Sequence, residues 1–376
     1  MNRKHSRRQF VRLLATGIGL SAASRLETSV SQSSRTAKAA VGFDWKRFKG
    51  TQIHFVMDSQ AWTEVMTKKI PEFQALTEIK VNWEVLTEAQ IRQKLPLTLR
   101  SNPESVDGFW TLPSFDVVPF SKAGWYEPLD KYIQSKDLTH PDFDFKDFFP
   151  NVLKIAQWGG VQIGIPAWTE LQLLFYNKEE FEKKKVSVPR TLDQFVEAAK
   201  TLNDRRRNLA GYLSRGQARQ AVYTLAPFVF AYGGRWQNEA GRPELDSEPF
   251  IKGLTVYGST LRHYGPPNIV GMEFSTAEAL FAQGQAAMFT DGAGFLFTFE
   301  DPKKSKVVGK VGVAPLPAGP TGTRSTMLSW SLAINSKSRK KEATWYLIQY
   351  LVSKENQRLT AAAFVPPTRQ SVWRSP

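Results

Sequence analysis

The sequence predicts an α/β fold in which part of the sheet is parallel. After the N-terminal basic segment the chain alternates strand-like and helix-like stretches, with strands expected at residues 51–57, 79–86 and 106–110. Such alternation is typical of βαβ units, whose strands run parallel. About 335 residues follow the basic segment, which is more than one hydrophobic core usually serves. We therefore expect two lobes.

The first predicted strand ends in a polar loop. Its apolar side chains alternate at Ile53, Phe55 and Met57, as in a strand with one buried face, and Asp58-Ser59-Gln60 follows directly. The next segment predicts a helix, which we expect Pro71 to kink or to end early. Its apolar residues have helical spacing: Trp62, Val65, Met66, Ile70 and Phe73.

Two further strands in this region also lead into loops or helices. Residues 79–86 alternate apolar side chains, and Thr87–Gln90 is a capping box that predicts a helix through Leu99. Open α/β sheets bind ligands at the carboxyl ends of their strands. The loops after Met57 and Phe109 are therefore the favoured positions for a ligand.

The rest of the chain continues the alternation. We expect Pro166 to interrupt a pair of strands in residues 161–177, and Gly233-Gly234 to end a helix that starts at Ala218. Ser275–Glu278 has the pattern of a second capping box. Further elements are expected as follows: a helix starting at Thr191, strands at residues 286–291 and 328–335, a strand and turn at residues 310–322, and a helix at residues 339–352.

The N-terminal residues have the layout of an export signal. Paired arginines, Arg7 and Arg8, precede a modestly apolar segment, and small residues at Ala37 and Ala39 offer a peptidase site. This layout resembles the twin-arginine type. The apolar segment is too short and too polar for a permanent membrane anchor. We expect residues 1–39 to be removed and the protein to reach the periplasm; a basic N-terminus on a cytosolic protein is the alternative.

The chain contains no cysteine. Disulfides, thiolate nucleophiles, iron–sulfur clusters and a lipid anchor on an N-terminal cysteine are therefore excluded. The formal charge is +15, but residues 1–39 carry eight Lys or Arg and one Glu, so the mature chain has +8. The remaining basic residues are dispersed, and no nucleic-acid-binding module accompanies them. We expect no cofactor and no nucleic-acid partner.

Several phrases occur in order across nearly the whole mature chain. They are SKAGWYEPLDKYI, IPAWTELQLLFYNKEEF, VPRTLDQFVEAAKTLND, FAYGGRW, FAQGQAAMFTDGAGF, VGVAPLPAGPTG, SWSLAINSKSRKKEATWYLIQYL and VPPTRQSVW. Together they resemble the extracellular solute-binding proteins of ABC importers, in the family that binds sugars and polyols. One departure is Ser329-Trp330-Ser331, where relatives often carry glycines, which puts the local contact there in doubt.

The resemblance implies a two-lobe periplasmic-binding-protein fold, type II-like, with a hinge and an interlobe ligand cleft. Mapped onto this chain, the N-terminal lobe is expected at residues 41–111 and 294–332 and the C-terminal lobe at residues 112–293 and 333–376. The implied function is capture of a carbohydrate or polyol and its delivery to ABC permease subunits in the inner membrane. Closure is expected because a ligand that contacts both lobes favours the closed state. We expect a monomer without catalytic activity.

Sugars are bound by flat aromatic rings and by oriented hydrogen-bonding side chains. Tryptophans at the ends of predicted elements are candidates for stacking on a ligand: Trp110, Trp168, Trp236 and Trp330. Core packing is the alternative for each ring, because it accounts for most tryptophans.

Polar candidates follow the same element ends. They are Asp58, Ser59, Gln60, Thr169, Glu170, Tyr232, Arg235, Asp291 and Arg369. A turn or a helix cap is the alternative for Asp58 and Asp291. For Tyr232 and Arg235 the alternative to ligand contact is an ordinary position on the surface.

Two rival functions stay open. A receptor for an anionic sugar acid or a phosphorylated polyol is motivated by the +8 charge and by Arg215, Arg219, Arg235, Arg324 and Arg369. A secreted carbohydrate-active enzyme is the second rival, because any two carboxylates can meet in space. Against other enzyme classes, the mature histidines lack metal-ligand spacing, and neither a nucleophile elbow nor a phosphate loop is present.

Overall fold

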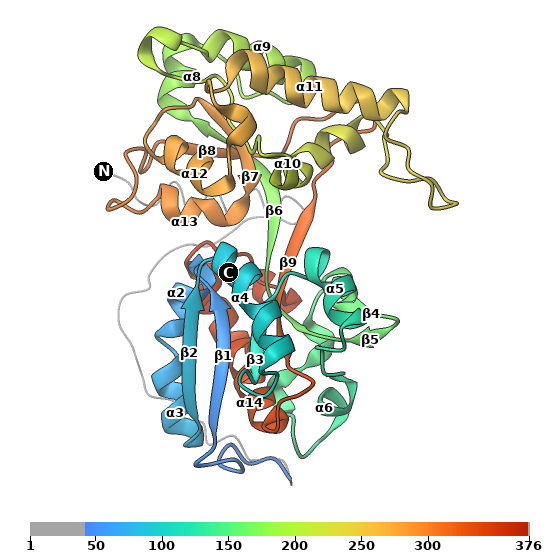
Figure 1. Ribbon diagram of the computed structural model, residues 1–376. Helices are drawn as coiled ribbons and strands as arrows, with labels where there is room; N and C mark the ends of the chain where they lie inside the picture. Colours follow the sequence, from blue (N-terminus) through green and yellow to red (C-terminus); the bar gives the residue numbers. More distant parts are fainter. Residues whose placement is uncertain (1–41, 375–376) are drawn as a thin grey trace. The chain divides into compact units, whose positions relative to one another are not determined.

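The computed structural model describes residues 42–374 (Figure 1). The predicted export signal, residues 1–39, lies outside the described residues. The described chain divides into two compact units, which we call the first unit (residues 42–170 and 328–374) and the second unit (residues 171–327). The chain leaves the first unit within strand β6 (Ile165–Asn177) and returns to it at strand β9 (Met327–Ile334).

This division differs from the predicted one. Residues 112–170 and 333–374 lie in the first unit, together with residues 42–111, whereas residues 294–327 lie in the second unit. The physical reason is that the first change of unit falls inside β6 and the second falls at the start of β9, so both lie in continuous strands. The apolar pattern continues through such a strand, so the sequence contains no linker that marks the boundary.

The sheet of the first unit contains the strand order β2–β1–β3–β9. Strand β1 (Gln52–Asp58) is parallel to β2 (Lys80–Leu86) and to β3 (Gly108–Thr111), while β9 is antiparallel to β3. The alternating face predicted for β1 is fully buried. The prediction that at least part of the sheet is parallel is therefore confirmed.

The helix predicted after β1 is split in two. Helix α2 (Ala61–Thr67) ends before Pro71, and α3 (Ile70–Thr77) begins there, with Pro71 in its first turn. A proline is tolerated at that place because the first N–H groups of a helix have no intrahelical partner. The early end that Pro71 predicted is therefore confirmed.

The capping box at the start of α4 (Glu88–Ser101) is also confirmed. The backbone N–H of Gln90 donates to Thr87 Oγ1 at 3.3 Å, and Gln90 Oε1 accepts from the Thr87 N–H at 2.9 Å. The reciprocal bonds satisfy two N–H groups at this helix terminus.

The remaining elements of the first unit complete its core. The helices are α5 (Pro113–Lys122), α6 (Asp130–Gln134), α7 (Pro150–Ile155), α14 (Lys341–Leu351), α15 (Lys354–Ala362) and α16 (Gln370–Trp373), with 3₁₀ turns at Pro141–Phe143 and Phe145–Asp147. A hairpin joins β4 (Gln157–Trp158) to β5 (Val161–Gln162). Its two-residue turn needs positive φ, which Gly159 and Gly160 supply at +58° and +82°.

Pro166 does not interrupt a strand, so that prediction is wrong. It is the second residue of β6, and the chain leaves regular structure earlier, at Ile163-Gly164. Proline is tolerated near the first residue of a strand because little of the hydrogen-bond ladder depends on its missing N–H.

The second unit is built around the later part of β6. Strands β7 (Met288–Gly292) and β8 (Val311–Ala314) both pair with it in antiparallel fashion. Helices and 3₁₀ turns surround these strands in the chain: α8 (Lys178–Lys184), α9 (Leu192–Leu202), Arg205–Arg207, α10 (Ala218–Ala231), α11 (Glu248–Tyr264), Ile269–Gly271, α12 (Phe274–Ala282), Ala293–Phe295 and α13 (Leu296–Phe299). The α9 and α10 helices pack against α11.

Two helix ends in the second unit test the sequence signals. The glycine stop of α10 is confirmed, since Gly233 takes a φ of +86° directly after the C-cap. The prediction of a second capping box at Ser275–Glu278 is wrong, because α12 begins at Phe274 and Ser275 lies inside its first turn. The Phe274 N–H is satisfied instead by Gln220 Oε1 of α10, at 2.9 Å, so a tertiary contact replaces the local cap.

The described residues contain no helix with the length and apolar content that a membrane span requires.

Candidate ligand-binding site

Three indole rings stack in the first unit. Trp168 of β6 lies between Trp62 of α2 and Trp330 of β9: its centroid is 5.1 Å from that of Trp62 and 5.4 Å from that of Trp330, with interplanar angles of 17° and 5°. Near-parallel rings at this spacing attract one another beyond the apolar area that they bury. Trp330, at 7%, is the most exposed of the three. All three rings are buried, and Trp330 forms the β9 end of the stack.

Asp58 is the last residue of β1 and is fully buried. Its Oδ1 accepts one long hydrogen bond from Thr63 Oγ1, at 3.4 Å, and its Oδ2 has no partner among residues 42–374. Burial raises the pKa of this carboxyl well above its usual value, and the negative charges of Glu88 and Glu170 raise the pKa further. The side chain caps no helix, because the N-cap of α2 is Gln60.

Neighbouring strands continue the polar row that starts at Asp58. The β1–β3 register pairs Phe55 with Gly108, so Asp58 lies level with Thr111, and Thr111 pairs with Ser331 of β9. Several buried polar atoms of these elements lack a partner among the described residues: Asp58 Oδ2, Trp62 Nε1, Trp110 Nε1 and Ser331 Oγ. Such atoms are rare in folded proteins and indicate places for a ligand or an ordered water.

Trp110 lies next to a charged network rather than in the stack. Its ring centroid is 5.7 Å from Arg92 Cζ, a distance that permits a cation–π contact. Arg92 donates from Nε to Glu88 at 2.8 Å and from Nη1 to Asp116 at 2.7 Å. Two carboxylates therefore balance the charge of Arg92. Arg92 was not among the predicted site residues, because an arginine four residues after Glu88 has the pattern of an ordinary surface pair.

The other polar candidates of the first unit lie around these groups. Ser59 is exposed, and its N–H donates to the Leu86 carbonyl at 2.8 Å. Thr169 is buried, and its Oγ1 donates to the Leu328 carbonyl at 2.7 Å. Gln60 and Glu170 are half-buried. Ser59 and Gln60 therefore follow the end of β1, Thr169 and Glu170 lie inside β6, and their contact with a ligand stays a prediction.

Arg369 has a structural environment in the first unit. Its guanidinium is fully buried and donates to three carbonyls: Val352 at 2.7 Å, Asp144 at 3.1 Å and Phe143 at 2.8 Å. It also lies 4.0 Å from the ring centroid of Phe148. Burial lowers the pKa of Arg369 to about 10. Backbone carbonyls therefore accept the guanidinium hydrogen bonds that were predicted to reach a ligand. The spacing of residues along the chain did not reveal these carbonyls as partners.

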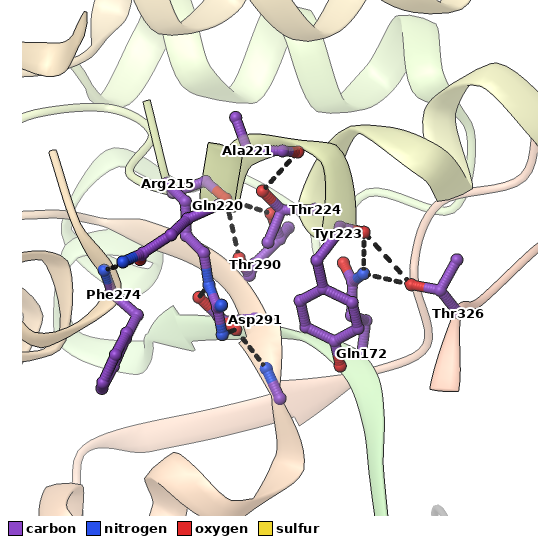
Figure 2. Close-up of polar contacts among 12 residues, drawn as sticks. Gln172, Arg215, Gln220, Ala221, Tyr223, Thr224, Phe274, Thr290, Asp291 and Thr326 are labelled. Atoms are coloured by element: carbon purple, nitrogen blue, oxygen red, sulfur yellow. Dashed lines mark hydrogen bonds and ion pairs between the residues drawn. The ribbon is translucent and has the colours of Figure 1, made fainter. Parts of the chain in front are cut away.

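Asp291, in the second unit, is held in a buried ion pair (Figure 2). Arg215 donates from Nε to Oδ2 at 2.8 Å and from Nη2 to Oδ1 at 2.6 Å, and Oδ1 also accepts from the Gly292 N–H at 2.8 Å. The Arg215 guanidinium lies 4.9 Å from the Tyr223 ring centroid and 5.4 Å from that of Phe274. This bidentate pairing occupies the carboxylate that the sequence proposed for ligand contact.

Further hydrogen bonds hold this cluster together. Tyr257 donates its hydroxyl hydrogen to the Arg215 carbonyl at 2.5 Å. Gln172 of β6 donates from Nε2 to the Tyr223 carbonyl and to Thr326 Oγ1, as Figure 2 shows. The Gln172 Oε1 atom has no partner among the described residues. One acceptor of this cluster therefore stays available.

Tyr232 and Trp236 lie at the end of α10 and in the loop after it, and both are half-buried. The Trp236 ring packs edge-on against Phe250, with centroids 5.1 Å apart, and Arg235 pairs with Glu244 at 3.2 Å. Trp236 thus has a packing partner on one side while part of its ring is accessible to solvent. Its ligand contact stays a prediction.

Trp62 was predicted only as one of the apolar residues with helical spacing and not as part of the site. Among the described residues, no group of three His, Cys, Asp or Glu side chains is arranged to hold a metal ion.

The chain is similar to proteins that bind polyols. An erythritol/L-threitol-binding protein of Mycolicibacterium smegmatis is 28% identical over 352 residues, which cover 88% of this chain and 73% of that protein. A mannitol-binding protein of Pseudomonas aeruginosa is 29% identical over 308 residues, or 79% of this chain and 68% of that protein.

Solved structures agree with the fold. A solute-binding protein of an ABC transporter from Agrobacterium vitis, with bound D-mannitol, superposes with a TM-score of 0.76 at 28% identity. The superposition covers 86% of this chain and 79% of the Agrobacterium vitis chain. The predicted α/β fold, the two-lobe periplasmic-binding-protein fold, is therefore confirmed. The sequence pattern of bacterial extracellular solute-binding proteins matches residues 58–358. The chain belongs to the family of bacterial extracellular solute-binding proteins.

Proposed function

We propose that the protein is the periplasmic substrate-binding component of an ABC importer and that its ligand is a polyol or a neutral sugar. The observation that carries the proposal is the stack of Trp62, Trp168 and Trp330 in the unit that also contains Asp58, whose Oδ2 has no partner among the described residues. Flat rings offer faces to C–H groups, and unpartnered polar atoms offer hydrogen bonds to hydroxyls. The relatives named for erythritol and mannitol binding support the same ligand class.

The existing partners of three arginines favour a neutral ligand over an anionic one. Arg215 is paired with Asp291, Arg235 with Glu244, and Arg369 is buried against backbone carbonyls and near Asp147. An anionic ligand needs a cation whose charge is not already balanced. Three of the five arginines that motivated the anionic alternative are thus engaged elsewhere.

The ligand class is tested by calorimetric titration with erythritol, ribitol, D-mannitol, a neutral hexose and a sugar acid. Binding of a neutral polyol with an affinity that is nearly indifferent to ionic strength supports the proposal, because exposed charges are screened by salt and hydroxyls are not. Exclusive binding of the sugar acid, weakened by salt, favours the anionic alternative.

We further propose that the protein binds without turning its ligand over, acts as a monomer and docks on the permease subunits of its importer. Incubation of the purified chain with glycosides tests the first point, since any product supports the enzyme alternative. Light scattering on the eluting protein tests the second. Stimulation of the reconstituted transporter's ATPase by liganded protein tests the third.

The export route is part of the same proposal. Arg7 and Arg8 followed by an apolar segment support the twin-arginine pathway, with cleavage near Ala39. Replacement of both arginines by lysine is expected to leave the precursor in the cytoplasm. The N-terminal sequence of the exported wild-type protein checks the cleavage position.

A further inference from the structure

The charges around Asp58 set it apart from the other buried aspartates. Among the described residues, Asp58, Asp107, Asp116 and Asp291 are buried. Asp107 lies 3.3 Å from Lys340 Nζ, Asp116 2.7 Å from Arg92 Nη1, and Asp291 2.6 Å from Arg215 Nη2. Asp58 alone of these four has no cation among residues 42–374 within ion-pair distance.

The groups that face Asp58 are neutral or negative. Thr63 on α2 donates the one long hydrogen bond, and the carboxylates of Glu88 on α4 and Glu170 on β6 are close enough to repel a negative charge. Removing a carboxylate from water without a cation is costly, and the group avoids the cost by taking up a proton. Burial and the two neighbouring carboxylates accordingly raise the pKa of Asp58.

We propose that Asp58 meets the ligand as an uncharged carboxylic acid and donates a hydrogen bond from its O–H to a hydroxyl oxygen of the polyol. The inference rests on the proposed function and adds the chemical form of one contact. A carboxylate only accepts hydrogen bonds, whereas a protonated carboxyl donates one and still accepts. The donor geometry requires an atom with no internal partner, and Asp58 Oδ2 is such an atom.

Other unpartnered atoms of the first unit have the same polarity. The indole Nε1 atoms of Trp62 and Trp110 are donors only, and both are buried without a partner among the described residues. A neutral Asp58 adds a third donor. A hydroxyl oxygen has two lone pairs and meets such donors, while its own hydrogen turns toward an acceptor such as Ser331 Oγ.

The test compares Asp58→Asn with Asp58→Leu, using the polyol that the wild-type chain binds. An amide has the shape of a carboxylic acid and keeps one donor and one acceptor, so Asp58→Asn is expected to bind within about threefold of wild type. Asp58→Leu removes both hydrogen-bonding atoms and is expected to lose at least about tenfold. A tenfold loss in Asp58→Asn, or no loss in Asp58→Leu, overturns the inference.

Failure of the inference is separable from failure of the proposed function. If the wild-type chain binds no polyol or sugar, the proposed function fails; if it binds and Asp58→Asn does not, only the inference fails. Asp107→Asn is the matched control, since Asp107 accepts from Ser338 Oγ at 2.6 Å and pairs with Lys340. It is expected to lower stability without changing the affinity of the folded protein.

Infrared spectroscopy reads the chemical form directly and does not depend on Asp58→Leu folding. At neutral pH the wild-type protein and Asp107→Asn are expected to show the carbonyl band of a protonated carboxylic acid, and Asp58→Asn is expected to lack it. The band is expected to shift when the polyol binds. Its absence from the wild-type spectrum overturns the inference.

Discussion

The ring of Trp330 lies parallel to that of Trp168, with 5.4 Å between the centroids and 5° between the planes. One face of Trp330 is thereby fixed by a second indole, which holds the ring in a single orientation. A ring held in this way loses little freedom when a ligand settles against it, and this reduces the cost of binding.

Replacement of Trp330 by alanine is expected to weaken polyol binding about tenfold, since loss of about 55 Å² of apolar contact at about 25 cal/mol per Å² costs about 1.4 kcal/mol. Titration calorimetry checks the value. Trp158→Ala is the matched control, because Trp158 is 41% exposed on the β4–β5 hairpin. Equal affinity of Trp330→Ala and wild type would remove Trp330 from the site.

Titration of the Asp58 carboxyl is expected to lower the free energy of unfolding as the pH rises. Its folded pKa is raised above the unfolded value, so its contribution is full below about pH 4 and is lost as the pH rises toward the folded pKa. The slope from this one group is about 1.4 kcal/mol per pH unit. Urea unfolding across the pH range measures it, with Asp58→Asn lacking this component. Parallel curves for the two proteins would contradict the assignment.

Arg369→Met is expected to lower the unfolding free energy by about 3 kcal/mol or more, because the carbonyls of Val352, Asp144 and Phe143 lose buried donors. Chemical denaturation measures the loss. Arg339→Met serves as the control: Arg339 pairs with Glu104 at the surface and is expected to cost less than about 0.5 kcal/mol. If the ligand affinity of folded Arg369→Met collapses while its stability is unchanged, the structural assignment is refuted.

Asp291→Asn is expected to destabilise the second unit by about 3–5 kcal/mol, because it leaves the Arg215 guanidinium buried without its anion. Hydrogen exchange resolved along the chain checks whether residues 171–327 lose protection first. A double variant, Arg215→Met with Asp291→Leu, is expected to recover part of the loss. A loss below about 1 kcal/mol in the single variant would show that the pair is not buried as described.

The fold was largely predictable, because βαβ alternation, the Thr87 capping box and the glycine stop after α10 are local signals. The position of Asp58 at the end of β1 was predictable in the same way, whereas Trp168 and Trp330 lie inside β6 and β9. The boundaries between the lobes were not predictable, since the chain changes unit inside β6 and at the start of β9, where no composition changes.

Long-range pairing accounts for the rest. Asp291 and Arg215 are separated by 76 positions, and Arg369 reaches carbonyls more than 220 positions away. No local pattern reports such partners. Trp62 was overlooked for a different reason: a ring on the buried face of a helix has the same spacing whether it packs only in a core or stacks in a site. The predicted closure of the lobes on a ligand stays a prediction, which solution scattering with and without ligand tests.

The most direct test of the central claim is a titration of the mature chain with erythritol, ribitol and D-mannitol, read by calorimetry and by thermal unfolding. The account predicts saturable binding of one polyol per chain and a stabilisation of about 2.7 kcal/mol when the free ligand is at a hundred times its Kd. No heat and no shift with any polyol or sugar, from a protein that is folded by circular dichroism, would contradict it.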